Sequence, residues 1–102
     1  GARNAGRFAS EEVDTMRNDY AKVKESLEAF VVLYETVLKT EILDNDKKLL
    51  VEAVLFFAKE TLKHVRNAEN AEKHDRPKEE IDNIYKKCEY CMLAVTAINN
   101  SL

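Results

Sequence analysis

Apolar side chains recur at steps of three and four residues along most of this chain. In the first stretch they fall at Val13, Met16, Tyr20, Val23, Leu27, Phe30 or Val31, Tyr34 and Val37. This period is typical of a helix that buries one face against other helices. The hydroxyl of Ser10 can cap such a helix, and the two glutamates that follow it suit the positive end of the helix dipole. The pattern therefore predicts a first helix from about Ser10 to Lys39 or Thr40.

Two polar breaks divide the rest of the chain into two further helices. At the first break, Asp44 or Asn45 can cap a second helix that begins near Asp46. At the second break, Pro77 favours the first position of a helix and disfavours helical geometry in the residue before it. The second seam continues through Thr61 or Leu62, Val65 and Ala68, and the third through Ile81, Ile84 or Tyr85, Cys88, Cys91 or Met92, Val95, Ile98 and Leu102.

Three long amphipathic helices with short joints predict one architecture. Helices joined by short connections pack as antiparallel neighbours, so we expect an all-α, antiparallel up-down-up three-helix bundle with coiled-coil-like packing. Residues 10–102 are its single domain. Residues 1–9 hold both glycines of the chain and are expected to be a flexible leader.

One end of this bundle carries more apolar residues than three helices need. A helix of a bundle uses about three apolar residues in seven, whereas residues 30–38 have seven in nine and residues 49–58 have nine in ten. These two segments lie side by side in the hairpin. Ordinary surface exposure, the loop and the third helix can account for the excess. The alternative is an apolar patch that binds a partner and holds some of Val32, Leu33, Leu55 and Phe56.

A basic stripe on the second helix is a second candidate surface. It consists of Lys59, Lys63 and Arg66, continued by Asn70 and Lys73. Such a stripe is either a solvated face or a docking surface for an acidic partner segment or an anionic membrane surface. Glutamates interrupt it, and the net charge of the chain is −3. Nucleic acid is therefore not an expected partner.

Cys88 and Cys91 have the spacing of a zinc or redox motif, and His64 and His74 could complete four ligands. The two cysteines nevertheless fall on the apolar seam of a helix, where cysteines usually serve only to pack. A redox pair would also need a thiolate stabilised at a helix N-terminus. We expect two core cysteines, no metal site and no cofactor. A small metal-binding helical protein is the least favoured alternative.

Other function classes are disfavoured by what the sequence lacks. With both glycines among residues 1–9, the chain has no phosphate-binding loop, and no catalytic spacing rises above chance, so we expect no enzyme. No run of about 18 apolar residues exists, so we expect no membrane span. The absence of an apolar signal segment and the core-patterned cysteines favour a cytoplasmic location.

In helix count, rough length and seam pattern, residues 10–102 resemble three-helix adaptor modules such as the GAT domains of vesicle-sorting adaptors and the BAG domains of heat-shock cochaperones. The resemblance covers architecture and no diagnostic motif, so it carries over no functional residues. It implies a non-catalytic module that binds a helix or peptide of another protein. The alternative is a homodimerisation or assembly module that uses the same apolar surface.

Overall fold

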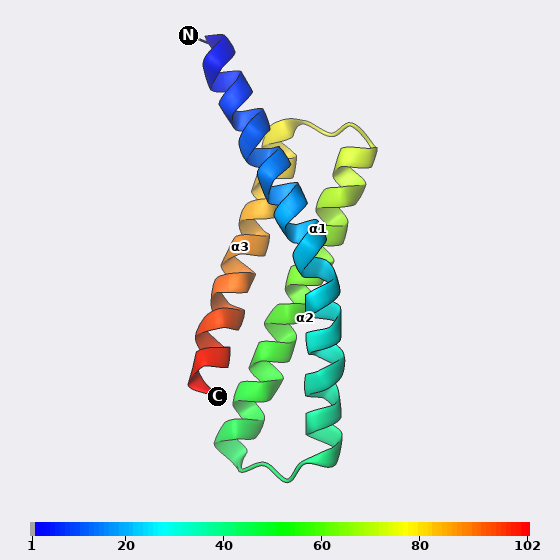
Figure 1. Ribbon diagram of the computed structural model, residues 1–102, viewed down its shortest axis with the longest axis vertical. Coiled ribbons are helices and arrows are strands. Elements are labelled where there is room, and N and C mark those ends of the chain that lie inside the picture. Colours follow the sequence, from blue (N-terminus) through cyan, green and yellow to red (C-terminus); the bar gives the residue numbers. More distant parts are fainter. Residues whose placement is uncertain (1) are drawn as a thin grey trace.

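The structure, a computed structural model, describes the backbone of residues 2–102 and the side chains of residues 17–102. Three helices alternate in direction, α1 (Ala2–Thr40), α2 (Asn45–Lys73) and α3 (Lys78–Ser101) (Figure 1). The molecule is elongated, with extents of 58 × 23 × 18 Å. The 39 residues of α1 account for the longest extent, because each helical residue adds about 1.5 Å. The predicted all-α, antiparallel three-helix bundle is confirmed.

The first helix begins earlier than the sequence indicated. It starts at Ala2, so Ser10 lies inside α1 and the predicted start at Ser10 is wrong. Five of residues 2–9 are Ala or Arg, and extending a helix through such good helix formers costs far less than nucleating one. The side chains of residues 2–16, including the seam residues Val13 and Met16, lie outside the described residues. The flexibility expected of residues 1–9 stays a prediction.

The joint between α1 and α2 follows the predicted capping chemistry. The carboxylate of Asp44 accepts a hydrogen bond of 2.8 Å from the backbone N–H of Lys47, which satisfies one of the free donors in the first turn of α2. Asp46 adds a negative charge to that turn, where the helix dipole favours it. Local residues therefore fix the start of α2 without help from the core.

The joint between α2 and α3 reverses the chain through a left-handed residue. Asp75 has a φ of 52°, and its N–H donates to Glu72 O while the N–H of Arg76 donates to Ala71 O. These two bonds are those of a Schellman motif, which satisfies the last carbonyls of a helix. Pro77 then occupies the position just before α3, one residue before its predicted place inside the helix. The motif explains why α2 ends sharply at Lys73.

The core consists of two clusters stacked along the bundle. The cluster nearer the α2–α3 joint contains Tyr20, Val65, Ala68, Ala71, Ile81, Tyr85 and Cys88. The cluster nearer the α1–α2 joint contains Leu27, Val54, Ala58, Leu62 and Val95, surrounded by half-buried residues such as Val23, Phe30 and Tyr34. Most of these residues belong to the predicted seams. The second cluster is thus bordered by apolar side chains that the bundle covers only in part.

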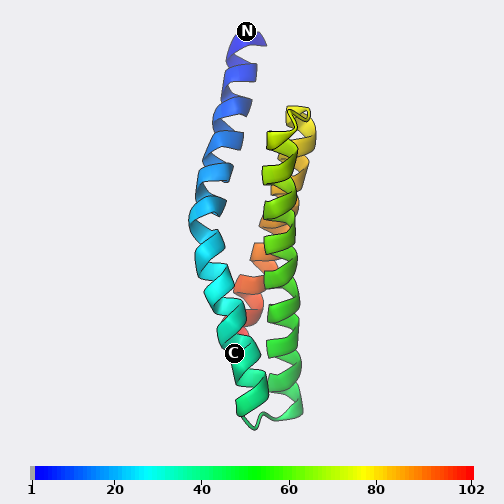
Figure 2. The ribbon, with the colours of Figure 1, turned by 90° about the vertical axis from the view of Figure 1, so that its right-hand side faces the viewer.

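The three helices do not pack equally. α2 and α3 share the most extensive interface, α1 and α2 a smaller one, and α1 and α3 the smallest. Figure 2 shows α1 closest to α2 near their joint. In Figure 1 the C-terminus of α3 lies short of the α1–α2 joint, since α3 has 24 residues and α2 has 29. None of the described helices is long and apolar enough to cross a membrane.

Candidate functional site

Three of the four residues expected in an apolar patch are on the surface. Val32, Leu33 and Phe56 are all well exposed, with Phe56 at 59%. Leu55 is only 5% exposed, so the expectation that it faces outward is wrong. The reason is its position on the side of α2 that faces α1: Lys59, one turn further along the same side, ion-pairs with Glu35 of α1. Whether the three exposed residues bind a partner stays a prediction.

The exposed apolar residues of the α1–α2 hairpin do not all point in one direction. Leu49, Phe56 and Lys63 are seven residues apart, so they share the outer side of α2, and all three are exposed. Val32 and Leu33 are neighbours in sequence and therefore point about 100° apart on α1. The expected patch is thus divided between separate directions. Exposed apolar side chains of this kind are common on protein surfaces.

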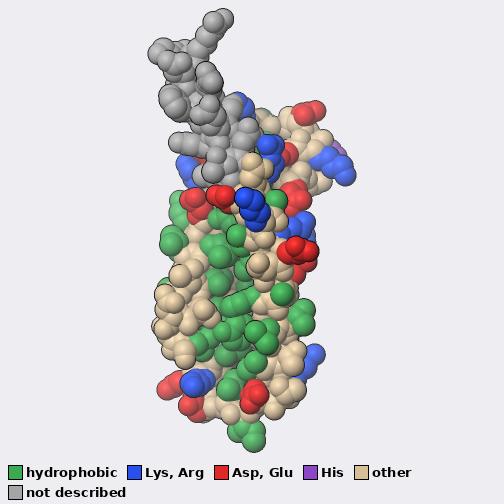
Figure 3. All heavy atoms as spheres, in the orientation of Figure 1, with side chains coloured by type: hydrophobic (Ala, Val, Ile, Leu, Met, Phe, Trp, Pro, Cys, Tyr) green, Lys and Arg blue, Asp and Glu red, His purple; other side chains and the backbone are tan. Residues whose placement is uncertain are grey.

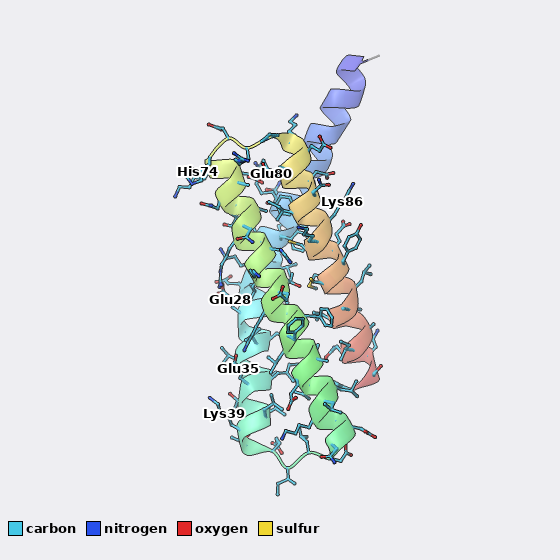
Figure 4. All side chains as sticks on the ribbon, turned by 180° about the vertical axis from the view of Figure 1, so that it is seen from behind. Glu28, Glu35, Lys39, His74, Glu80 and Lys86 are labelled. Atoms are coloured by element: carbon cyan, nitrogen blue, oxygen red, sulfur yellow. The ribbon has the colours of Figure 1, made fainter. Side chains whose placement is uncertain are left out.

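The basic stripe is largely engaged within the chain. Lys59 Nζ lies 2.9 Å from Glu35 Oε1, and the Arg66 guanidinium lies 3.7 Å from Glu28 Oε1. Figure 4 shows Glu28 and Glu35 along the edge of α1 beside α2. A hydrogen bond from Lys59 and its positive charge hold the pKa of Glu35 below its usual value. Lys63 stays exposed on the outer side of α2. Two of the three basic residues therefore align α1 with α2.

The seam between α1 and α3 is open along part of its length. Two adjoining hollows of about 250 and 340 Å³ lie along it. Together they are lined by Asp19, Tyr20, Val23, Glu89, Met92, Leu93 and Thr96, which we call the α1–α3 groove. Leu93 is 69% exposed on its α3 wall. The groove thus has an apolar floor and a large exposed leucine beside it.

Apolar side chains continue this surface beyond the groove. Figure 3 shows hydrophobic atoms gathered in a band between α3 and α1 over the lower two thirds of the molecule. Half-buried Phe30 and Tyr34 of α1 and Ile98 of α3 pack against the second core cluster. The Tyr34 hydroxyl donates to Asn99 Oδ1 at 2.8 Å, which ties the two helices near the end of α3. The α1–α3 side is therefore the largest continuous apolar region that the figures display.

Tyr20 gives the groove its one nearly buried polar side chain. The residue is 8% exposed and its ring stacks on Tyr85 with centroids 5.8 Å apart. No group among residues 17–102 hydrogen-bonds its hydroxyl. No sealed side-chain oxygen in that range lacks a partner, so the hydroxyl is not fully enclosed, and the residue lines the groove. Burial, with the nearby Cys88, Glu89 and Asp19, raises the pKa of Tyr20 well above its usual value. The hydroxyl therefore stays protonated.

A larger hollow of about 740 Å³ lies between α1 and α2, lined in part by Arg17, Glu69, Glu72 and Tyr85. The Tyr85 hydroxyl donates to Glu72 Oε1 at 2.9 Å, and Arg17 lies 3.3 Å from Glu72 Oε2. Lys24 donates to Glu69 at 3.1 Å. A ligand would have to displace these contacts, so the larger volume is the weaker candidate site. Its polar groups instead connect the three helices.

The cysteines and histidines do not assemble into a site. Cys88 is buried and Cys91 half-buried, and both are free thiols. Burial and then the neighbouring Cys91 raise the pKa of Cys88 to about 12, which makes it a poor nucleophile. His64 Nε2 lies 3.8 Å from Glu60 Oε2, four residues earlier on the same helix. Within residues 17–102 no group of three or more potential ligands is placed to hold a metal ion.

Sequence reasoning did not find the α1–α3 groove. It assigned Tyr20, Val23 and Met92 to the apolar seams of their helices, and this assignment is correct. It does not reveal that the seam between α1 and α3 stays open. Leu93 was the available signal, because it is a large apolar residue that lies off the predicted α3 seam.

Comparison of the chain with models of protein families, with curated proteins and with solved structures found no match.

Proposed function

We propose that this protein is a non-catalytic interaction module that binds an amphipathic helix of another protein along the α1–α3 groove. The supporting observation is the open seam itself. α2 and α3 close over a packed core, while α1 and α3 leave an apolar floor partly exposed between them. Exposed apolar surface of this kind marks binding sites more often than isolated exposed residues do.

A helix suits the shape of this surface. The groove runs between two helices, and a helix laid into it would complete a fourth member of a bundle. Helix-in-groove complexes place apolar anchors at i, i+3 or i+4 and i+7. The α1 seam has the same period, with Tyr20, Val23, Leu27 and Phe30 in succession. Of these, Tyr20 and Val23 line the groove, and Phe30 is half-buried further along. A peptide strand would find no sheet edge to extend among the described residues.

A homodimer through the same surface is the alternative assembly. It would cover the groove with a second copy, without a separate partner. Sedimentation across a low to high micromolar range distinguishes the two, because the proposal expects a monomer. A dimer that Leu93→Asp converts to a monomer would replace the proposal with the assembly function.

The direct test selects helical peptides from a displayed library on the folded protein and measures their affinity for two variants. Leu93→Asp places a charge on the wall of the groove, so binding should weaken at least about tenfold, the effect of a lost anchor worth about 1.4 kcal/mol. Phe56→Asp is the matched control, because Phe56 is similarly exposed but lies on the outer side of α2. Thermal unfolding of both variants checks that they remain folded.

The outcomes separate clearly. Peptides with an apolar i, i+3, i+7 pattern that lose affinity only with Leu93→Asp support the proposal. Failure to select any peptide, or affinity that depends on Phe56 and not on Leu93, would overturn it.

A further inference from the structure

The Tyr20 end of the α1–α3 groove carries three oxygen-bearing groups beside an apolar floor. Asp19 and Tyr20 come from α1 and Glu89 comes from α3, and each of them lines the hollows. All three residues line the same hollow of about 250 Å³, which places them around one opening. The other end of the seam is closed differently, by the hydrogen bond between Tyr34 and Asn99.

These three groups have no ion-pair or hydrogen-bond partner among the side chains of residues 17–102. Asp19 and Glu89 form no ion pair within residues 17–102, whereas the carboxylates along the α1–α2 seam are paired with lysine or arginine. Lys86 lies one turn before Glu89 in α3, but it ion-pairs with Asp82 at 3.3 Å. Tyr20 is more than nine-tenths buried, lines the groove, and has no hydrogen-bond partner for its hydroxyl among residues 17–102. A nearly buried polar group open to a hollow is usually matched by a polar group of whatever fills it.

We propose that the Tyr20 end of the groove receives an arginine or lysine of the docked helix, held by Asp19, Glu89 and the Tyr20 hydroxyl. This assignment rests on the proposed function and specifies the chemistry of its partner: an amphipathic helix with an apolar stripe and a basic residue beside it. A guanidinium matches the set well, because it donates to several oxygens at once. Tyr20 lines both hollows.

The same charges disfavour a second copy as the occupant. A two-fold dimer centred on these hollows would bring the Asp19 and Glu89 carboxylates of both copies together, because a two-fold interface pairs the same patch with itself. Like charges in such proximity oppose association. A basic partner helix gains from the same arrangement, so charge complementarity favours a different protein.

The test uses two synthetic helical peptides of about 18 residues, or five turns, stapled to hold the helix. Both carry leucines at i, i+3 or i+4 and i+7. One has an arginine beside the stripe, and the other has citrulline, its neutral isostere, at that position. Affinity is measured by fluorescence anisotropy, and the contact surface is mapped by NMR shifts of backbone amides in Tyr20, Met92 and Leu93.

We expect the arginine peptide to bind about tenfold more tightly than the citrulline peptide, as for a charge-assisted contact with two carboxylates. In the double variant Asp19→Asn/Glu89→Gln the two peptides should bind equally. The control variant Glu25→Gln/Glu52→Gln changes the net charge by the same amount on exposed residues outside the groove, and it should keep the tenfold preference. Added salt should reduce the preference without removing binding.

Each result has one meaning. Equal binding of both peptides in the groove of the unmodified chain would overturn this inference and leave the proposed function standing. No binding of either peptide at millimolar concentration would overturn the proposed function and this inference together. A preference that survives in Asp19→Asn/Glu89→Gln would place the basic contact elsewhere and overturn the inference.

Discussion

The two edges of α1 differ in chemistry although they belong to one continuous helix. The edge beside α2 is lined by charges that pair across the seam: Lys24 with Glu69, Glu28 with Arg66, and Glu35 with Lys59. The edge beside α3 carries apolar side chains, a hydrogen bond from Tyr34, and Asp19, which has no ion pair among residues 17–102. Within that range, the charged groups of the first edge are paired across the seam, whereas Asp19 on the second edge is not.

The difference indicates how a small bundle can combine a fixed fold with a binding surface. Exposed ion pairs contribute little to stability, typically under about 1 kcal/mol each, but they favour one alignment of two helices. With α1 aligned on α2 in this way, its other edge need not pack tightly against α3. The apolar surface left there lies over a closed core and not in a mobile loop.

The largest expected effect is on stability, and it compares one substitution, leucine to alanine, at a site in the closed core and at a site on the open groove. Leu62→Ala removes a leucine that is 5% exposed in the second core cluster, so stability should fall by about 3 kcal/mol through lost burial and a cavity. Leu93→Ala, on the groove wall, should change stability by less than about 0.5 kcal/mol. Urea denaturation measures both. Comparable losses would mean that the α1–α3 seam is closed in solution.

A smaller effect distinguishes the two stacked tyrosines. Tyr85→Phe removes the hydroxyl that donates to Glu72, and stability should fall by about 1.5–3 kcal/mol, the range for a hydrogen bond to a charged group. Tyr20→Phe keeps the ring stack and removes a hydroxyl that has no partner in the described chain, so stability should change by less than about 0.5 kcal/mol. Denaturation midpoints give both values. A larger loss for Tyr20→Phe would show that its hydroxyl is already bonded.

The smallest effect concerns the ion-paired edge. In Lys59→Met the pKa of Glu35 should rise toward its usual value, because the lysine that lowers it is gone. A carboxyl with a lowered folded pKa adds stability above its unfolded pKa and loses it as pH falls through the folded pKa. The small stability difference between the two proteins should therefore be present at neutral pH and disappear in acid. NMR titration of the Glu35 side-chain carboxyl carbon follows the pKa directly.

Lys63→Met is the matched control for that titration. Lys63 lies one turn from Lys59 but on the outer side of α2, with no ion pair described. The titration of Glu35 should be unchanged in this variant. An equal rise in both variants would mean that the overall positive charge of α2, and not the specific pair, lowers the pKa.

The sequence predicted those parts of the fold that local chemistry controls. The Asp44 cap, the break at Pro77 and the apolar seams of α2 and α3 all depend on neighbouring residues. The predicted start of α1 was wrong, because the ability of Ser10 to cap a helix does not exclude a helix that begins earlier, in the helix-forming residues before it.

The candidate site was harder to predict for a geometric reason. A helix turns by about 100° at each residue, so an uncertainty of one position in register separates buried Leu55 from exposed Phe56. The groove depends further on how closely α1 approaches α3, which no residue pattern encodes. Tyr20 illustrates the point: its position follows the seam, yet the hollow that it lines depends on how α1 and α3 are packed.

The left-handed conformation of Asp75 has a consequence for how this sequence can vary. A positive φ costs most residues about 1–2 kcal/mol, and β-branched residues more, whereas glycine adopts it freely and asparagine or aspartate with little penalty. The polar residues around it are exposed and have no such restriction. During evolution the exposed polar positions of the α2–α3 turn can therefore accept many substitutions, while position 75 is restricted to aspartate, asparagine or glycine.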